Sequence, residues 1–253
     1  MSDFKMEAPD RRLVIDVGNS AMKAACFDGT TLQPPVYRHA AGDWAAIDRA
    51  ATNLGVRYII YSTVANVPSE RWTDKWEQDG RRVFALDRSR PLPFAADYNV
   101  AELGQDRIAA VAGTLGLLRT ARLIVDAGSC VTFELVDADD RYRGGNISPG
   151  LRMRLRAMHE GTARLPLVAP DHPQGDVGRS THAALQHGGL RGIVYEAEGL
   201  WHRLRTDHPD LHLCFTGGDA PLLLPHVTVP CTHYPNLVLR GLNQILSTYV
   251  NAS

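Results

Sequence analysis

Two stretches of the sequence each place a carboxylate and a glycine directly after a run of apolar residues. The first spans residues 13–20 and carries Asp16, and the second spans residues 123–130 and carries Asp126. Glycine permits a tight turn whose exposed backbone amides can bind phosphate oxygens, and the carboxylate can hold a metal ion beside them. One such turn alone is explained as a capped hairpin. Two copies, with a third glycine turn at residues 216–219, favour a nucleotide-binding site.

The first copy carries additional groups that suit phosphate. Asn19, Ser20 and Lys23 add hydrogen-bond donors around Gly18. The sequence contains neither the G-x-x-x-x-G-K-[ST] pattern of P-loop proteins nor a G-x-G-x-x-G turn after a strand. A chain that binds ATP without these patterns would use paired hairpin turns, in the manner of the actin, sugar-kinase and heat-shock ATPase superfamily.

A third candidate lies between the two copies, in the Gly-Gln-Asp-Arg segment at residues 104–107. Asp106 stands at the start of a helical pattern, where a carboxylate is a good cap and is favoured by the helix dipole. The functional alternative is that Asp106 accepts a proton from a substrate alcohol, while Arg107 and nearby amides orient an anionic substrate. This segment alone supports both interpretations equally.

The elements that would position these residues follow from hydrophobic periodicity. Strands are predicted at residues 12–16, 21–28, 36–38, 58–62, 83–85, 122–126, 132–137, 141–143 and 211–215. Helices are predicted at residues 41–53, 71–80, 106–119, 151–159, 181–202 and 236–250, and loops at 90–98 and 144–150. The helix over 181–202 is expected to be interrupted by the glycines at 188, 189 and 192. Because strands and helices alternate in both halves, we expect an α/β architecture with two similar subdomains, residues 1–119 and 120–253.

Composition narrows the class of protein. The chain has 253 residues, 44% of them hydrophobic, which suffices for a substantial core. A formal net charge of −1 argues against a large basic face for nucleic acid. The four cysteines and ten histidines show no metal-binding spacing, so a catalytic zinc is not expected. Neither a signal peptide nor an apolar stretch of membrane-spanning length is evident, so we expect a cytoplasmic protein without a membrane partner.

Taken together, the motifs resemble those of one family, type III pantothenate kinase, the enzyme class that opens coenzyme A synthesis in many bacteria. Seven segments in the family's order carry the resemblance. They are residues 16–23, 104–107, 126–132, 144–150, 180–188, 216–220 and 236–242.

The resemblance implies a duplicated ribonuclease-H-like (actin-like ATPase) α/β fold, with ATP in the cleft between the two subdomains. Asp126 would hold a monovalent cation, potassium or ammonium, which the family requires along with magnesium. The ATP contacts implied by the resemblance are Asp16, Val17, Gly18, Asn19, Ser20, Ala21, Met22, Lys23 and Ser129.

The resemblance also implies the acceptor site. Asp106 would be the general base for the primary hydroxyl of pantothenate, and members of the family are homodimers with the pantothenate pocket near the subunit interface. The residues implied to bind pantothenate are Tyr98, Gly104, Gln105, Asp106, Arg107 and Thr181. The Tyr98 assignment rests on a stretch one residue shorter than the family's pattern.

Three other functions are compatible with parts of the sequence. A kinase of the same superfamily could act on a sugar or an acetate-like acid, although residues 104–107 and 144–150 argue against it. Some relatives are described as accessory factors for virulence-gene expression, and a fold does not fix a function. Asp16, Asp106 and Asp126 are all present, which disfavours a purely regulatory role. An actin-like chaperone or filament would need a longer chain.

Overall fold

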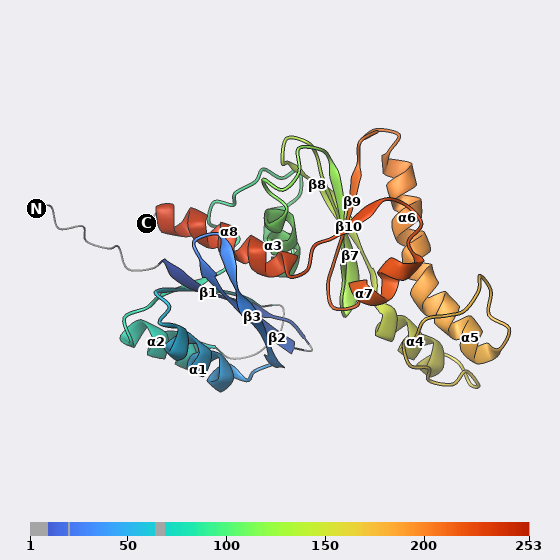
Figure 1. Ribbon diagram of the computed structural model, residues 1–253, viewed down its shortest axis with the longest axis horizontal. Helices are drawn as coiled ribbons and strands as arrows, with labels where there is room; N and C mark the ends of the chain where they lie inside the picture. The colour runs from blue at the N-terminus through green and yellow to red at the C-terminus, as the bar shows by residue number, and fades with distance from the viewer. Residues whose placement is uncertain (1–9, 20, 64–68, 253) are drawn as a thin grey trace, which may run out of the picture. The chain divides into compact units, whose positions relative to one another are not determined.

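The computed structural model describes residues 10–19, 21–63 and 69–252 (Figure 1). These residues fall into two compact units, each with its own sheet. The first unit comprises the described residues of Met1–Pro93, Ala101–Gly113 and Val238–Ser253, and the second comprises Phe94–Val100 and Thr114–Leu237. Among the described residues, no helix is both long and apolar enough to cross a membrane.

The first unit contains a five-stranded sheet of order β3-β2-β1-β4-β5. Its first three strands form an antiparallel meander, and β4 and β5 run parallel to β1. The strands are β1 (Arg11–Val17), β2 (Ala21–Asp28), β3 (Thr31–Ala40), β4 (Tyr58–Thr63) and β5 (Arg82–Ala85). The helices are α1 (Trp44–Leu54), α2 (Glu70–Gln78), α3 (Gln105–Gly113) and α8 (Leu237–Asn251), and a short 3-10 turn, η1 (Val100–Glu102), precedes α3.

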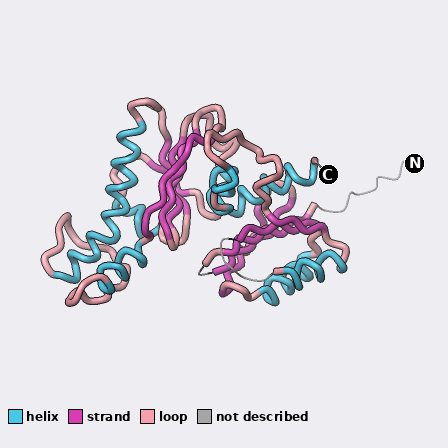
Figure 2. The backbone as a smooth tube through the Cα atoms, turned by 180° about the vertical axis from the view of Figure 1, so that it is seen from behind, coloured by secondary structure: helices cyan, strands magenta, loops and turns pink. Residues whose placement is uncertain are grey.

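Alternating side chains of β1 face two helical layers, which Figure 2 shows on either side of the strands. Leu13 and Ile15 pack with Trp44 of α1 and Trp76 of α2 in one apolar cluster. The opposite face meets α3 and α8, where Arg12 donates a hydrogen bond to Ser247 of α8. Burial on both faces explains why β1 has a continuous apolar run, and it puts Asp16 on the α3 side of the sheet.

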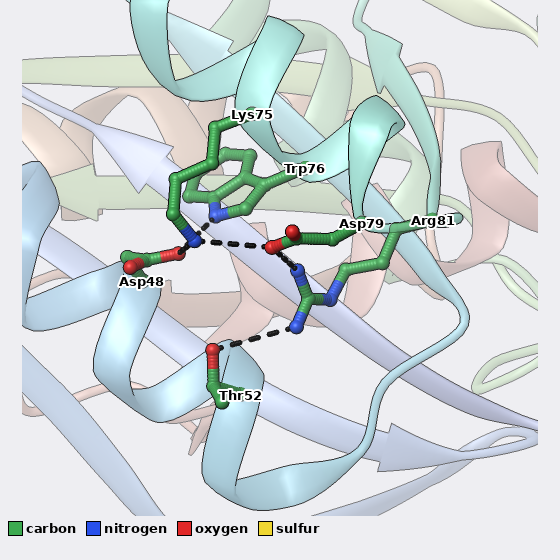
Figure 3. A network of polar contacts seen from close by, with 6 residues as sticks. All are labelled: Asp48, Thr52, Lys75, Trp76, Asp79 and Arg81. Atoms are coloured by element: carbon green, nitrogen blue, oxygen red, sulfur yellow. Dashed lines mark hydrogen bonds and ion pairs between the residues drawn. The ribbon is translucent and has the colours of Figure 1, made fainter.

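A polar network fastens α2 onto α1 (Figure 3). Asp48 accepts hydrogen bonds from Lys75 Nζ and from Trp76 Nε1, each at 2.9 Å. Asp79 accepts from Lys75 at 3.0 Å and from Arg81 at 2.7 Å. Because Trp76 is fully buried, its indole N–H needs this acceptor. The network therefore fixes the helical layer on the face of the sheet away from Asp16.

Helices α3 and α8 approach each other so closely that a side chain does not fit at Gly241. A Cβ built there would lie 1.7 Å from the carbonyl oxygen of Ala109 and 2.7 Å from the backbone nitrogen of Gly113. We expect Gly241→Ala to lower the free energy of unfolding by about 3 kcal/mol, since backbone must move apart. Urea denaturation measures this.

The matched control for that variant is Gly199→Ala in helix α6 (Gly192–Leu204), where a Cβ would meet nothing within 4 Å. Alanine is the better helix former, so this change is expected to raise the free energy of unfolding by about 0.5–1 kcal/mol. Equal urea midpoints for the two variants would contradict the close packing of α3 and α8.

The second unit repeats the topology of the first, with a sheet of order β10-β9-β6-β7-β8. The strands are β6 (Arg122–Ala127), β7 (Cys130–Val136), β8 (Tyr142–Pro149), β9 (His212–Thr216) and β10 (Cys231–His233). Its other elements are α4 (Leu151–Glu160), α5 (Thr181–Gln186), the π-helical turn η2 (His187–Arg191), α6, α7 (Ala220–Leu223) and η3 (Leu224–His226).

The two sheets match strand for strand. In each, the central strand pairs antiparallel with the next strand in sequence and parallel with a later one, as β1 does with β2 and β4, and β6 with β7 and β9. This confirms the predicted α/β architecture with two similar subdomains. Helix α8 lies in the first unit, although it closes the chain. The boundary between residues 119 and 120 stays a prediction.

Two sequence-based element predictions were wrong. The helix predicted over 106–119 ends at Gly113, and Gly116 follows in the left-handed conformation at a φ of 72°. The segment 144–150, predicted as a loop, is mostly strand β8. Its glycines disfavour a strand, but hydrogen bonding to β7 stabilises one there. The helix predicted over 181–202 is divided at its glycines, as expected, into α5, the π-helical turn η2 and α6.

Candidate active site

Asp16 stands at the carboxyl end of the central strand of the first unit. Its register partners are Lys23 on β2 and Ser62 on β4, so all three side chains lie on one face of the sheet. The Ser62 hydroxyl donates a hydrogen bond to Asp16 Oδ1 at 3.2 Å. The strand end therefore presents a carboxylate, an ammonium group and a hydroxyl side by side.

The electrostatic environment of Asp16 opposes its ionised form. Burial raises the pKa of its carboxyl group above the ordinary value of 3.8. The positive charge of Lys23 and the hydrogen bond from Ser62 act in the other direction, and the negative charge of Asp106 raises the pKa further. The ionised form of Asp16 is thus unfavourable in the folded protein, and a bound cation would stabilise it.

The turn after Asp16 is short and closed by its own backbone. The amide of Gly18 donates to the carbonyl of Ala21 at 3.0 Å, and a Cβ on Gly18 would lie 3.2 Å from that oxygen. Asn19 is exposed, whereas the side chains of Val17 and Met22 are buried in the core. Only backbone atoms of Val17 and Met22 are therefore available to a ligand. Ser20, also predicted to contact ATP, lies outside the described residues.

Asp106 occupies the first turn of α3, on the same side of the first sheet as Asp16. Its Oδ1 accepts a hydrogen bond from the backbone N–H of Arg107 at 2.9 Å. A Cβ on Gly104 would lie 2.5 Å from that Asp106 oxygen, so glycine leaves the room that the carboxylate occupies. Arg107 is 5% exposed and Asp106 is half-buried. The structure thus brings Asp16, Lys23 and Asp106 together.

In the second unit, Asp126 is the counterpart of Asp16. Its register partners are Thr132 on β7 and Thr216 on β9. The glycine turn after β9 wraps against it: Gly217 has a φ of 95°, and a Cβ there would lie 2.5 Å from Asp126 Oδ1. Both carboxylates have a hydroxyl residue on the parallel neighbour strand, Ser62 or Thr216. On the antiparallel neighbour, however, Asp126 faces Thr132 where Asp16 faces Lys23, so the two carboxylates are not equivalent.

The turn that contains Ser129 is covered by another close backbone approach. The amide of Gly150 donates to the carbonyl of Ser129 at 3.2 Å. A Cβ on Gly150 would lie 2.2 Å from the carbonyl oxygen of Gly128, which only glycine avoids. Farther along, Asp219 accepts a 2.6 Å hydrogen bond from Arg152 of α4. Three segments distant in sequence therefore meet around Asp126.

The two remaining predicted substrate residues lie on separate elements of the second unit. Tyr98 packs against Tyr142 of β8, with ring centroids 5.8 Å apart. Thr181 is the exposed first residue of α5, where the Ser180 hydroxyl caps the helix by accepting from the Ala183 amide at 3.1 Å. Their contacts with pantothenate stay predictions.

Two residues near the carboxylates escaped the sequence analysis. Ser62 follows an apolar run at a strand end, the same signal that pointed to Asp16, but it lacks the neighbouring glycine. Thr216 was noted only as part of a glycine turn, and its place beside Asp126 depends on the pairing of β6 with β9.

Magnesium and a monovalent cation both suit the oxygen donors present. Kinases hold magnesium with one or two carboxylates and with the phosphates of the nucleotide, so a cage made by protein alone is not required. Within the described ranges, no cluster of three or more histidine, cysteine, aspartate or glutamate side chains could hold a metal ion. Asp16 and Asp126, each with hydroxyl neighbours, are therefore the carboxylates that could hold a cation beside the nucleotide.

Comparisons with known proteins agree with this arrangement. The type III pantothenate kinase family matches residues 12–203. A type III pantothenate kinase from Bacteroides fragilis is 36% identical over 237 residues, 93% of this chain and 97% of that protein. A conserved candidate transcriptional activator of the Baf family from Campylobacter jejuni, 24% identical, superposes with a TM-score of 0.59 over 94% of this chain and 99% of that one. A candidate N-acetylmannosamine kinase from Listeria monocytogenes, 11% identical, gives a TM-score of 0.54 over 94% and 99%.

The structural neighbours confirm the duplicated ribonuclease-H-like fold of actin-like ATPases and sugar kinases, and at these identities they speak for the fold alone. The sequence relatives speak for more, because the matched residues include both Asp-x-Gly turns and the start of α3. This chain belongs to the type III pantothenate kinase family.

Proposed function

We propose that this protein transfers the γ-phosphoryl group of ATP to the primary hydroxyl of pantothenate, giving 4'-phosphopantothenate in the first step of coenzyme A synthesis. The observation that carries the proposal is the pairing of Asp16 and Asp106 in a chain that belongs to this family. An alcohol acceptor needs a base, and a phosphoryl donor needs its charge neutralised, so two acids with different tasks are expected.

In this mechanism Asp106 accepts the proton of the pantothenate hydroxyl as the new P–O bond forms and the bond to ADP breaks. Pantothenate is oriented by Tyr98, the segment from Gly104 to Arg107, and Thr181. The buried guanidinium of Arg107 attracts the pantothenate carboxylate.

The nucleotide is held by the two turns. Backbone amides around Gly18, the Lys23 ammonium and Ser129 bind ATP phosphates. Asp16 would hold magnesium, which would neutralise charge on the phosphates. Asp126 seats potassium or ammonium. Because the reaction consumes ATP, we place the protein in the cytoplasm.

The first test is an ATP-consumption assay with pantothenate, coupled to detection of the phosphorylated product. We expect turnover with pantothenate and none with sugars or acetate. Turnover with a sugar instead of pantothenate would assign a different kinase activity, and no turnover with any acceptor would refute the proposal.

The role of Asp126 has its own prediction. Wild-type activity is expected to rise several-fold when sodium in the buffer is replaced by potassium or ammonium, because Asp126 and its threonine neighbours offer hard oxygen donors for a desolvated cation. An Asp126→Asn variant is expected to lose that activation. Equal initial rates in sodium and potassium would contradict the proposal that Asp126 binds a monovalent cation.

We also propose a homodimer. Large apolar side chains are exposed on the second unit and are available for a subunit contact. They are Ile147, Met153, Leu167, Val177 and Tyr195. Light scattering on the purified chain distinguishes a monomer from a dimer.

A further inference from the structure

The side-chain amide of Gln105 makes two hydrogen bonds to the backbone of the first sheet. Its Oε1 accepts from the N–H of Thr63 at 2.7 Å, and its Nε2 donates to the C=O of Leu86 at 2.8 Å. Thr63 is the last residue of β4, and Leu86 directly follows β5. Gln105 thus bridges the carboxyl ends of two neighbouring strands from the first residue of α3.

The amide takes the place of a missing bond between the strands. Tyr61 and Ala85 are register partners, and the amide of Leu86 donates to the carbonyl of Tyr61 at 2.8 Å. In a parallel pair the next bond would run from the Thr63 N–H to the Leu86 C=O. Those are the two groups that Gln105 satisfies, so its amide continues the β4–β5 ladder as an inserted peptide group would.

Residues next to Gln105 also contact the edge of the first sheet. Arg88 Nε donates to the carbonyl of Leu103 at 2.7 Å, and the Leu103 side chain is fully buried. The chain from Leu103 to Gln105 is therefore tied to the sheet edge immediately before Asp106. The Gln105 amide uses its acceptor and one donor on backbone groups, so the role of this side chain is structural.

We propose that Gln105 is a positioning residue, which sets the first turn of α3 on the ends of β4 and β5 so that the Asp106 carboxylate stands beside Asp16. The proposal rests on the proposed kinase function. It assigns the Gln105 side chain to the placement of the base, and leaves substrate contact to the backbone of this segment.

The test uses Gln105→Met in the full-length protein, because methionine keeps the length of the side chain and removes both hydrogen-bonding groups. We expect kcat for pantothenate phosphorylation to fall about ten- to a hundredfold, the cost of a small misplacement of a reacting group. KM for ATP and for pantothenate are expected to stay within about twofold of wild type. Gln78→Met, the same change at an exposed position near the end of α2, is the matched control and should leave kcat unchanged.

A second variant, Gln105→Glu, separates positioning from general loss of stability. Its carboxylate can accept from Thr63 but cannot donate to Leu86, whereas its protonated carboxyl group can do both. The ratio of its kcat to that of wild type is therefore expected to rise as the pH is lowered. For the Gln105→Met variant this ratio is expected to stay flat.

Amide hydrogen exchange measured by NMR gives a readout that does not depend on activity. Thr63 is expected to lose protection in Gln105→Met and to keep it in Asp106→Asn. Unchanged protection of Thr63, or lost protection with unchanged kcat, would overturn the proposal. A raised KM for pantothenate with kcat retained would make Gln105 a substrate ligand instead. If the wild-type protein does not phosphorylate pantothenate, the kinase proposal fails, and the exchange of Thr63 still decides whether Gln105 holds the sheet edge.

Discussion

An Asp106→Asn variant is expected to phosphorylate pantothenate about 10²- to 10⁴-fold more slowly than wild type, with ATP and pantothenate still bound. Asparagine has the shape of aspartate, and its Oδ1 can still accept the hydrogen bond from the Arg107 amide that Asp106 accepts at 2.9 Å. It cannot take up a proton from the substrate hydroxyl. Steady-state kinetics gives kcat, and calorimetric titration gives both dissociation constants.

The competing explanation is that Asp106 only caps α3, and a matched variant tests it. Asp43 caps α1 by accepting from the Ala46 amide at 3.2 Å, and Asn is an equally good cap. Asp43→Asn should therefore leave kcat and the melting temperature unchanged. If Asp106→Asn behaves in the same way, with near-normal turnover, Asp106 is a cap and some other group is the base.

The sequence predicted the central strands of both sheets well because these strands are buried on both faces. A strand such as β1 has no solvent side, so its apolar run is continuous, and the acid that ends it is conspicuous. The same signal located β6 and Asp126. The repeated strand pattern then gave the two similar subdomains, which the matching strand orders confirm.

Residues whose roles depend on pairing between distant segments were harder to find. Ser62 bonds Asp16 across 46 positions of sequence, and Gln105 reaches Thr63 across 42. Neither bond has a periodicity or a motif that a single sequence reveals. Close backbone approaches are equally invisible: Gly150 was predicted to lie in a loop, and nothing local indicates that it presses on the turn at Gly128.

Element ends were the other source of error. The apolar pattern of α3 continues past Gly113, yet the helix stops there, close to the point where Gly241 of α8 packs against it. Strand β8 lies at the edge of its sheet, where glycine and proline are tolerated, so its composition resembled that of a loop. In both cases tertiary contacts overrode the local pattern.

Asp16→Asn is expected to lower turnover by about 10²-fold while raising the melting temperature of the protein without ligand at pH 7. Activity falls because the carboxylate proposed to hold magnesium is lost. Stability rises because burial and the charge of Asp106 raise the pKa of Asp16 above 3.8, so the folded state disfavours the ionised group. Asparagine keeps the shape and removes the half-buried charge.

The pH dependence of the stability gain follows from the direction of that shift. A carboxyl group with a raised pKa in the folded state contributes stability that is fully present below 3.8 and is lost as the pH rises through its folded value. The advantage of Asp16→Asn should therefore be largest at neutral pH and shrink as the pH approaches 3.8. Thermal melts of the variant and of wild type across this range measure it.

Magnesium and ATP should then reverse the order of the melting temperatures. A ligand that binds only the folded state adds stability in proportion to the logarithm of its concentration over its dissociation constant. Wild type, with its carboxylate, is expected to gain more from magnesium-ATP than Asp16→Asn does. If the variant gains as much, Asp16 does not hold the cation. If the variant without ligand is less stable than wild type, the ionised carboxylate does not destabilise the folded state. A reversal would show that the fold tolerates the unfavourable charge of Asp16 because the nucleotide's cation neutralises it.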